Sequence, residues 1–265
     1  MPNLGERWFA FNLIEELDQP GEWYLDRASG LLYVLPPADL SKARVDFPLL
    51  AAPFVAMQDV RNVTLRGLVF EVGRAEGAVI TGGEQVLLAG CTFQQLGANG
   101  VVIRGGTGHG VLGCDIRSVG AGGVRVAGGD RKTLTPGNHF VENCHISDFS
   151  RVDRVYAPAV YVDGVGQRIA HNLLHDSGGY GPGRGGKFEF PHYSWGIYLD
   201  LACSGWRIHD NIVWNTVLGG FMLNAGVDNT VENNIFVAGK QNQVQFNPWP
   251  KYPMSGHRCE RNIIS

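Results

Sequence analysis

The sequence predicts an all-β protein, a right-handed parallel β-helix of ~23-residue coils that follows a small α+β segment. Three observations predict it. Similar short apolar strands recur at a nearly constant step along most of the chain. Within each copy, apolar residues alternate with variable ones, which is the period of a strand and not of a helix. The 37 glycines of the chain suit the many turns of such a coil.

The residue that ends each recurring strand measures the step of the repeat. From the first copy to the last, these residues are Met57, Thr81, Arg104, Ala127, Asp163, Asp200, Asn224 and Asn247. The residue numbers rise by ~23 at most steps, and only the steps that reach the two aspartates are much longer. A constant step with two longer copies predicts stacked coils with inserted loops.

A second column of residues follows the second strand of each copy and supports the same register. Its members are Cys91, Cys114, Cys144, Asn172, Asn211, Asn234 and Asn262. Stacked asparagine amides can hydrogen-bond from coil to coil at an inward turn. The cysteines at the same place are expected to be buried free thiols, because cysteine spacings typical of metal sites are missing and five is an odd number. We therefore expect no disulfide framework, metal or cofactor.

The chain is expected to have two parts. Residues 1–50 form a small α+β, insertion-like segment, with helical turns over 11–17 and a β-hairpin over 22–35 that turns at Gly30. Residues 51–265 form the β-helix. Because the chain stops within a repeat, at 262–265, we expect it to be a piece of a longer protein.

The composition of the chain argues against nucleic acid and membrane as binding partners. The chain has 22 basic and 25 acidic residues, with a formal net charge of −3, and it lacks a basic run of the kind that binds nucleic acid. It also lacks an apolar stretch of ~20 residues, so no membrane contact is expected. We expect a monomer. The first residues show no signal-peptide pattern, which leaves the compartment open: cytoplasmic as written, secreted or periplasmic if the N-terminus is truncated.

The two long copies end in similar phrases, Val-Tyr-Val-Asp at 160–163 and Ile-Tyr-Leu-Asp at 197–200. Strand alternation directs Asp163 and Asp200 outward, and stacking at ~4.8 Å places their carboxyl groups roughly 5–6 Å apart. That separation is typical of the carboxylate pair of a retaining glycosidase. Two close carboxylates should raise one pKa, which suits an acid/base beside a nucleophile. Either aspartate can take either role, and Asp200 is favoured as the nucleophile.

The surroundings of the aspartates favour a carbohydrate substrate. The extra residues at 130–137 and 178–195 are expected to lie before the two Asp-bearing strands, and loops of this size often shape a pocket. Aromatic faces and polar groups hold sugars. The candidate substrate-binding residues are Tyr161, Tyr198, Trp195, Tyr180, His192, Arg104, Arg125 and Asn224. A plain structural interpretation stays open, because outward aspartates often only end strands.

Four segments resemble one protein family. They are Asn-Leu-Ile-Glu-Glu-Leu-Asp-Gln-Pro-Gly-Glu-Trp-Tyr-Leu-Asp at 12–26, Leu-Tyr-Val-Leu-Pro-Pro at 32–37, Gly-Gly-Asp-Arg-Lys-Thr-Leu-Thr-Pro at 128–136 and Gly-Ile-Tyr-Leu-Asp at 196–200. The chain resembles bacterial β-helix proteins of the glycoside hydrolase family 141 type over nearly its whole length. The resemblance implies a β-helix with an inserted small domain, action on plant or algal fucosides or xylosides, and a catalytic pair of aspartates.

Two other functions fit a β-helix. A polysaccharide lyase acting on a uronate polymer would need a basic catalytic residue and often Ca²⁺ held by outward acids. The expected face has Arg104 and Arg125 but no acidic cluster, which places the lyase second. A non-catalytic, glycan-binding β-helix is the third possibility. The fold alone does not decide between them.

Overall fold

The computed structural model describes residues 10–177 and 193–265. Its chain divides into two compact units, Met1–Phe47 and Pro48–Ser265.

The N-terminal unit is a β-hairpin flanked by short 3₁₀ turns. Its elements are η1 (Ile14–Glu16), β1 (Trp23–Asp26), β2 (Leu31–Val34) and η2 (Leu40–Lys42). The hairpin is antiparallel and pairs Trp23 with Val34, and Gly30 turns it in the left-handed region at φ 75°. The hairpin and the turn lie where the sequence places them, although the helical part is one 3₁₀ turn.

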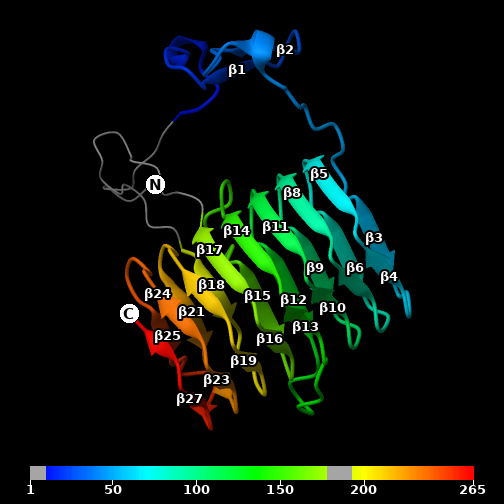
Figure 1. Cartoon of the computed structure of the whole chain (residues 1–265), viewed down its shortest axis with the longest axis vertical. Coiled ribbons are helices and arrows are strands. Elements are labelled where there is room, and N and C mark those ends of the chain that lie inside the picture. The colour runs from blue at the N-terminus through cyan, green and yellow to red at the C-terminus, as the bar shows by residue number, and fades with distance from the viewer. Residues whose placement is uncertain (1–9, 178–192) are drawn as a thin grey trace. The chain divides into compact units, whose positions relative to one another are not determined.

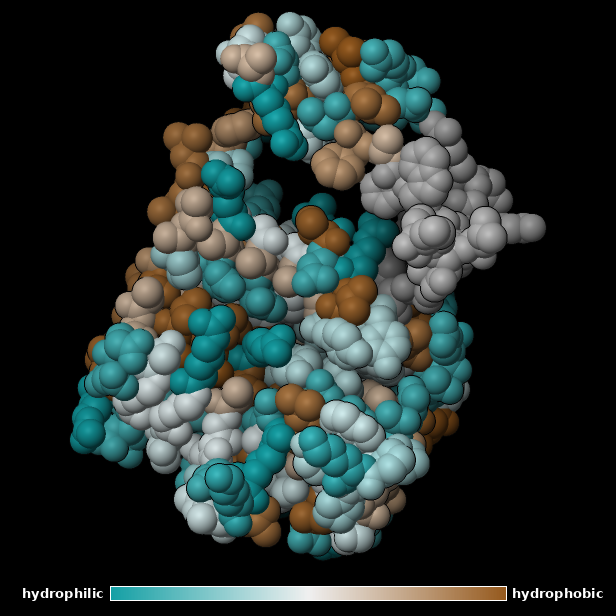
Figure 2. All heavy atoms as spheres, turned by 180° about the vertical axis from the view of Figure 1, so that it is seen from behind, coloured by the Kyte–Doolittle hydropathy of each residue, from teal (hydrophilic) through white to brown (hydrophobic). Residues whose placement is uncertain are grey.

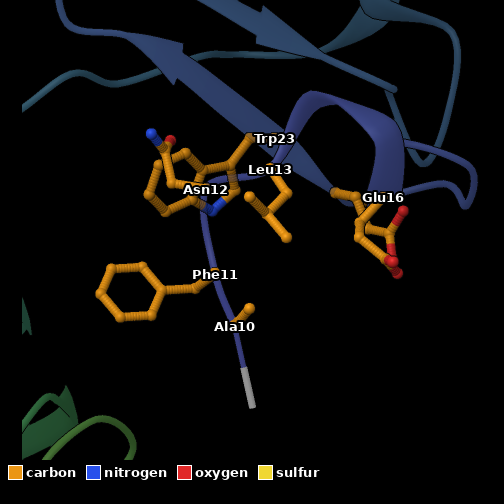
Figure 3. A pocket seen from close by; sticks show the side chains of 8 residues that line it. Ala10, Phe11, Asn12, Leu13, Glu16 and Trp23 are labelled. Atoms are coloured by element: carbon orange, nitrogen blue, oxygen red, sulfur yellow. The ribbon is translucent and has the colours of Figure 1, made fainter.

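A surface pocket of about 330 Å³ lies within this unit (Figure 3). It is lined by Ala10, Phe11, Asn12, Leu13, Glu16, Gly21, Glu22 and Trp23. Asn12 braces one wall, because its side chain accepts a hydrogen bond from the backbone N–H of Leu25 and donates one to the Leu25 carbonyl, at 2.8 and 3.0 Å. The Glu22 carboxylate accepts from two backbone N–H groups, so it serves the turn at 18–22.

The second unit is a β-helix whose coils lie side by side in chain order (Figure 1). In its described residues, three parallel sheets of eight strands form the walls. The first sheet contains β3 (Val55–Gln58), β6 (Ala78–Thr81), β9 (Val101–Arg104), β12 (Val124–Gly128), β15 (Val160–Gly164), β18 (Trp195–Leu199), β21 (Gly219–Asn224) and β25 (Val244–Asn247).

The other two sheets continue each coil. The second sheet contains β4 (Thr64–Arg66), β7 (Leu87–Ala89), β10 (Gly110–Leu112), β13 (Phe140–Glu142), β16 (Arg168–Ala170), β19 (Arg207–His209), β23 (Thr230–Glu232) and β27 (Arg258–Glu260). The third contains β5 (Val69–Gly73), β8 (Thr92–Leu96), β11 (Asp115–Val119), β14 (His145–Phe149), β17 (Leu173–Ser177), β20 (Ile212–Trp214), β24 (Ile235–Val237) and β28 (Ile263–Ile264). The short strands β22 (Gly226–Val227) and β26 (Met254–Ser255) pair separately.

The predicted strand-end column is confirmed except at its first member. Thr81 pairs with Arg104 and Arg104 with Ala127, but Thr81 pairs on its other side with Gln58 and not with Met57. Met57 instead pairs with Ile80, and it packs against the core. An apolar residue next to the strand end therefore shifted the predicted register by one position.

The core fills the space between the three sheets. Val160, Val162, Ile197 and Leu199 are fully buried there, as the alternation predicts. On the face shown in Figure 2, hydrophilic residues are interspersed with hydrophobic ones. A mixed surface is ordinary for a folded protein, because apolar atoms make up much of any protein surface. No helix among the described residues is long and apolar enough to cross a membrane.

The asparagine column forms the predicted ladder at the turn between the second and third sheets. Asn211 Oδ1 accepts from the backbone N–H and the Nδ2 of Asn172, at 3.1 and 2.9 Å. Asn234 receives the same two bonds from Asn211, and Asn262 from Asn234. All five cysteines of the chain are free thiols, four of them buried, and Cys144 begins the ladder by donating its N–H to Asn172.

A second ladder, which the sequence did not predict, lies at the turn from the first sheet to the second. The Nδ1 atom of His109 accepts the backbone N–H of Val86, and His139 Nδ1 accepts that of His109, at 3.1 and 3.0 Å. The two buried rings stack with centroids 5.0 Å apart. Burial and the neighbouring His109 lower the pKa of His139 to about 4. Both rings must therefore be neutral to accept these bonds.

This ladder predicts acid-sensitive stability. In the unfolded chain His139 should titrate near 6.5, and in the folded chain near 4, so stability is fully present above 6.5 and falls as the pH drops toward 4. We expect a loss of about 3 kcal/mol over that range. His139→Gln should flatten this part of the curve, because glutamine already occupies the next coil at Gln167 and does not titrate. Urea unfolding from pH 4 to 8 measures it, and parallel curves for the two proteins would contradict it.

Candidate active site

Asp163 and Asp200 occupy neighbouring rungs at the same end of the first sheet. The strands β15 and β18 pair Val162 with Leu199, and the next residue on each strand is an aspartate. The Asp200 N–H donates to the Val162 carbonyl at 3.0 Å, which holds the rung together. Both side chains are partly exposed. The parallel register therefore brings together two carboxylates that are 37 positions apart in the chain.

Asp200 is held by hydrogen bonds on both carboxylate oxygens. Tyr161 donates its hydroxyl to Oδ2 at 2.8 Å, and Asn224 donates its Nδ2 to Oδ1 at 2.9 Å. The backbone N–H of Leu201 also donates to Oδ1, at 2.8 Å. Burial works to raise the pKa of the Asp200 carboxyl, but these hydrogen bonds outweigh it, so the pKa lies below its ordinary value. Asp200 is an oriented, ionised carboxylate at neutral pH.

Asp163 is paired with an arginine from the loop that follows β12. The Nη2 atom of Arg131 donates to Asp163 Oδ1, and both side chains are about one-third exposed. The lowered pKa belongs to the aspartate that is favoured as the nucleophile, the ionised member of the pair. Each carboxylate has partners of its own, an arginine for Asp163 and hydrogen-bond donors for Asp200.

The aromatic residues around Asp200 form a packed cluster. Tyr161, Tyr198 and Trp195 are only 6, 2 and 2% exposed, and they pack with Leu218 and Met222. Tyr161 and Tyr198 meet edge to face at 5.5 Å. These three rings therefore do not offer open faces for sugar stacking in this structure. Strand alternation does place the tyrosines outside the coil, but residues around them then cover that face.

The covering residues come partly from the segment that leads into β15. The Tyr156 ring stacks on Tyr198 with centroids 6.0 Å apart and meets the half-exposed Tyr193 edge to face at 4.9 Å. This segment, and not 130–137, immediately precedes the strand that carries Asp163. The 130–137 loop lies between β12 and β13, so β13 and β14 separate it from β15, because the long coil divides its extra residues between two turns.

The basic candidates have different surroundings. The Arg125 guanidinium lies 3.9 Å above the Tyr161 ring centroid, so it braces the tyrosine that holds Asp200. Arg104 is exposed at the end of β9, and Ala127 separates it from Asp163 in the column. Asn224 lies next to Asp200 and accepts a hydrogen bond from Asn247 at 3.0 Å. Tyr180 and His192 lie outside the described residues.

Arg131 and Tyr156 are the residues of this site that the sequence interpretation did not assign. Arg131 lies in an insertion that directly follows the strand carrying Ala127, the neighbour of Asp163. One sequence signal could have identified it. Ala127 is small and lies beside Asp163 in the strand-end column, and the loop that follows Ala127 carries a basic residue. Tyr156 has no comparable signal, because its position depends on the path of an irregular segment.

A second surface pocket, of about 280 Å³, lies at the edge of the second sheet. It is lined by Pro136, Asn138, His139, Gly166, Gln167, Arg168, Gly205 and Arg207. Neither this pocket nor the one in the N-terminal unit is lined by Asp163 or Asp200. Asp163 and Asp200 lie partly exposed on the outer face of the first sheet.

Comparison with known families supports the architecture. The family model of the right-handed β-helix region matches residues 54–252. The chain belongs to the right-handed β-helix family. That stretch covers nearly all of the three sheets, including the rungs of Asp163 and Asp200.

One solved structure similar to this β-helix protein is titled "Glycoside hydrolase". It superposes with a TM-score of 0.62 at 14% sequence identity, and the match covers 95% of this chain and 57% of that one. The chain thus spans less than two-thirds of that structure, and at this identity the likeness establishes a shared fold. A search of curated proteins found no match.

Proposed function

We propose that this β-helix protein is a glycoside hydrolase that acts with retention on a plant or algal glycan of the fucoside or xyloside type. The observation that carries the proposal is the pair of partly exposed carboxylates on adjacent rungs. Rungs stacked at about 4.8 Å suit the separation of about 5–5.5 Å used by retaining enzymes. The resemblance to glycoside hydrolase family 141 and the fold shared with a structure titled "Glycoside hydrolase" point the same way.

Asp200 has the properties of the nucleophile. Its lowered pKa keeps it ionised, and bonds from Tyr161 and Asn224 fix its orientation. It attacks the anomeric carbon while the bond to the leaving oxygen breaks, which gives a glycosyl ester on Asp200. Because the step needs an anomeric carbon, the proposed substrate is a carbohydrate.

Asp163 then takes the acid/base role. It gives its proton to the departing glycosidic oxygen, and afterwards takes a proton from the water that hydrolyses the ester. Arg131 pairs with Asp163 in the free protein. The acid role therefore requires that substrate binding displace Arg131 from Asp163.

The function is tested with aryl fucosides and aryl xylosides, followed by uronate polymers. We expect release of the aryl alcohol and a first-formed sugar with the anomeric configuration of the substrate, read by proton NMR. A product of inverted configuration would contradict the retaining pair. An unsaturated product from a uronate polymer, detected by ultraviolet absorbance, would identify a lyase instead.

A non-catalytic, glycan-binding role is the second candidate. It is favoured by one observation, that both carboxylates have internal partners, Arg131 for Asp163 and Tyr161 with Asn224 for Asp200. In that case binding to glycan arrays should occur without turnover and should survive replacement of both aspartates.

Tyr161→Phe tests how Asp200 is held. The change removes one hydrogen bond that lowers the pKa of Asp200, so this pKa should rise. The acidic limb of the kcat/KM profile should move to higher pH, and kcat should fall by about 10-fold to 100-fold. Phenylalanine retains the ring that packs under Arg125, so the fold should persist. An unchanged acidic limb in an otherwise active variant would show that Tyr161 does not tune Asp200.

A further inference from the structure

A group of metal-binding side chains lies on a different face of the β-helix from the aspartates. His209 ends β19, Asp210 follows it, and His171 follows β16 in the preceding coil. The register pairs Ala170 with His209, so His171 and Asp210 are neighbours across coils. The three residues lie at the turn between the second and third sheets, beside the asparagine ladder.

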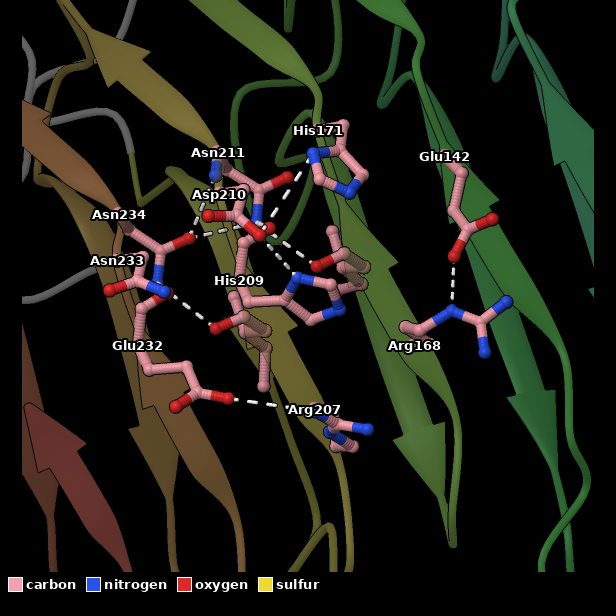
Figure 4. Close-up of polar contacts among 12 residues, drawn as sticks. Glu142, Arg168, His171, Arg207, His209, Asp210, Asn211, Glu232, Asn233 and Asn234 are labelled. Carbon is pink, nitrogen blue, oxygen red and sulfur yellow. Dashed lines mark hydrogen bonds and ion pairs between the residues drawn. The ribbon is translucent and has the colours of Figure 1, made fainter.

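The ligand atoms of these side chains converge (Figure 4). One such atom from each of His171, His209 and Asp210 lies within 4.8 Å of the other two. The Nδ1 atoms of His209 and His171 both face Asp210 Oδ2, at 2.7 and 3.9 Å. Ligands around a tetrahedral Zn²⁺ ion with bonds of 2.0–2.1 Å lie about 3.3 Å apart. The two observed distances fall on either side of that value, so small side-chain rotations suffice.

The turn position of His171 is conformationally special. Its φ of 56° and that of Asp210, 57°, lie in the left-handed region. Other coils fill the same position with Gly90, Gly113, Asn143, Asn233 and Arg261. Histidine is among the residues that adopt this region several-fold more often than most. At this turn it brings an imidazole beside His209.

The turn holds the three side chains on a rigid support. Asn211 follows Asp210 directly, is fully buried, and donates its Nδ2 to the His209 carbonyl at 3.0 Å. Asn172 follows His171 and is tied to Asn211 by two hydrogen bonds. Ligands whose backbone is fixed in this way lose little freedom on metal binding.

The arginines near His171, His209 and Asp210 pair with other carboxylates. Glu232, the neighbour of His209 on the next coil, pairs with Arg207 at 3.6 Å (Figure 4). Glu232 also pairs with Arg261. Arg168, on the strand that leads to His171, donates to Glu142. Each of these arginines thus has a carboxylate partner.

We propose that His171, His209 and Asp210 bind a divalent transition-metal ion of the zinc type. Two imidazoles and one carboxylate suit Zn²⁺, Ni²⁺ and Cu²⁺ better than the all-oxygen sites that hold Ca²⁺ or Mg²⁺. His171 and Asp210 are exposed and His209 is partly exposed, so water or a donor from another molecule completes the coordination. The ion joins two coils and stabilises the folded chain by mass action.

Titration of the tag-free chain with zinc chloride, followed by calorimetry, tests the site. We expect one ion per chain. His209→Ala and His171→Asn should each weaken binding by at least about tenfold. Both replacements copy neighbouring coils, which have Ala170 and Asn143 at the equivalent positions. His145→Ala on β14 is the control and should bind zinc as the unchanged protein does.

Melting temperature and Co²⁺ absorption provide two further tests of the metal site. Excess Zn²⁺ should raise the melting temperature of the unchanged protein and of His145→Ala, but not of His209→Ala. Co²⁺ should give visible absorption bands that disappear in His171→Asn. Wild-type zinc affinity in either variant would overturn the proposal, as would no binding by the unchanged protein at 100-fold excess, or binding lost only in His145→Ala.

Discussion

Asp200→Asn should lower kcat on an aryl glycoside by more than about 1,000-fold, because the amide cannot form the glycosyl ester. The effect should exceed that of any other single change at the site, since the carboxylate is the attacking group. The amide keeps the size of the side chain. Its oxygen can accept from Asn224 and from the Leu201 N–H, and its nitrogen can donate to the Tyr161 hydroxyl oxygen. Initial rates of aryl alcohol release, with circular dichroism to verify folding, measure the result.

Asp115→Asn is the matched control for that change. Asp115 begins β11 on the third sheet, and its side chain is half exposed. This variant should keep full activity. Comparable activity of Asp200→Asn and the unchanged protein would remove Asp200 from the mechanism. External azide should restore turnover of Asp200→Ala if the residue is the nucleophile, because a small anion can then attack in its place.

Asn211→Ala should destabilise the folded chain by about 3 kcal/mol or more. The residue is fully buried at the centre of the ladder. Its loss leaves the N–H and Nδ2 of Asn172 without their acceptor and removes the Nδ2 donor from the carbonyls of Ile169 and His209. The His209 carbonyl keeps the backbone N–H of His171 as a donor. Unsatisfied buried polar groups cost about 1–3 kcal/mol each, and partial rearrangement reduces the sum. Urea denaturation measures the free energy of unfolding.

Asn247→Ala provides the comparison for the ladder. Asn247 is exposed, and its side chain donates a hydrogen bond to Asn224. Its replacement should change the free energy of unfolding by about 0.5 kcal/mol or less. Equal costs for the buried and the exposed asparagine would show that the ladder does not hold the coils together. A melting temperature that drops only for Asn211→Ala would support it.

Much of the fold follows from the sequence because repetition and alternation act on every coil. The column through Arg104, Asp163 and Asp200 and the ladder through Asn172 and Asn211 both needed only a constant step. The single register error, at Met57, arose at the first coil, where one neighbour is missing. The ladder of His109 and His139 was overlooked because its members differ from coil to coil, although they share one place before the second strand.

The candidate site was predicted less well than the fold, and the reason is local. Adjacent rungs for Asp163 and Asp200 follow from register, but the partners of a carboxylate depend on loops without a repeat. Arg131 reaches Asp163 from such a loop, and Tyr156 covers Tyr198 from another. The sequence predicted open aromatic rings, whereas packing buries them, and the hydrogen bonds that lower the pKa of Asp200 could not be predicted from the repeat.

The most direct test of the account is to trap the covalent intermediate. The protein is incubated with activated 2-deoxy-2-fluoro fucosides and xylosides, which slow hydrolysis of the glycosyl ester, and is then digested and mapped by mass spectrometry. The account predicts one added sugar on the peptide that contains Asp200, and none in Asp200→Asn. An active protein that forms no adduct, or that forms one on another residue, would contradict the assignment of Asp163 and Asp200 as a retaining pair.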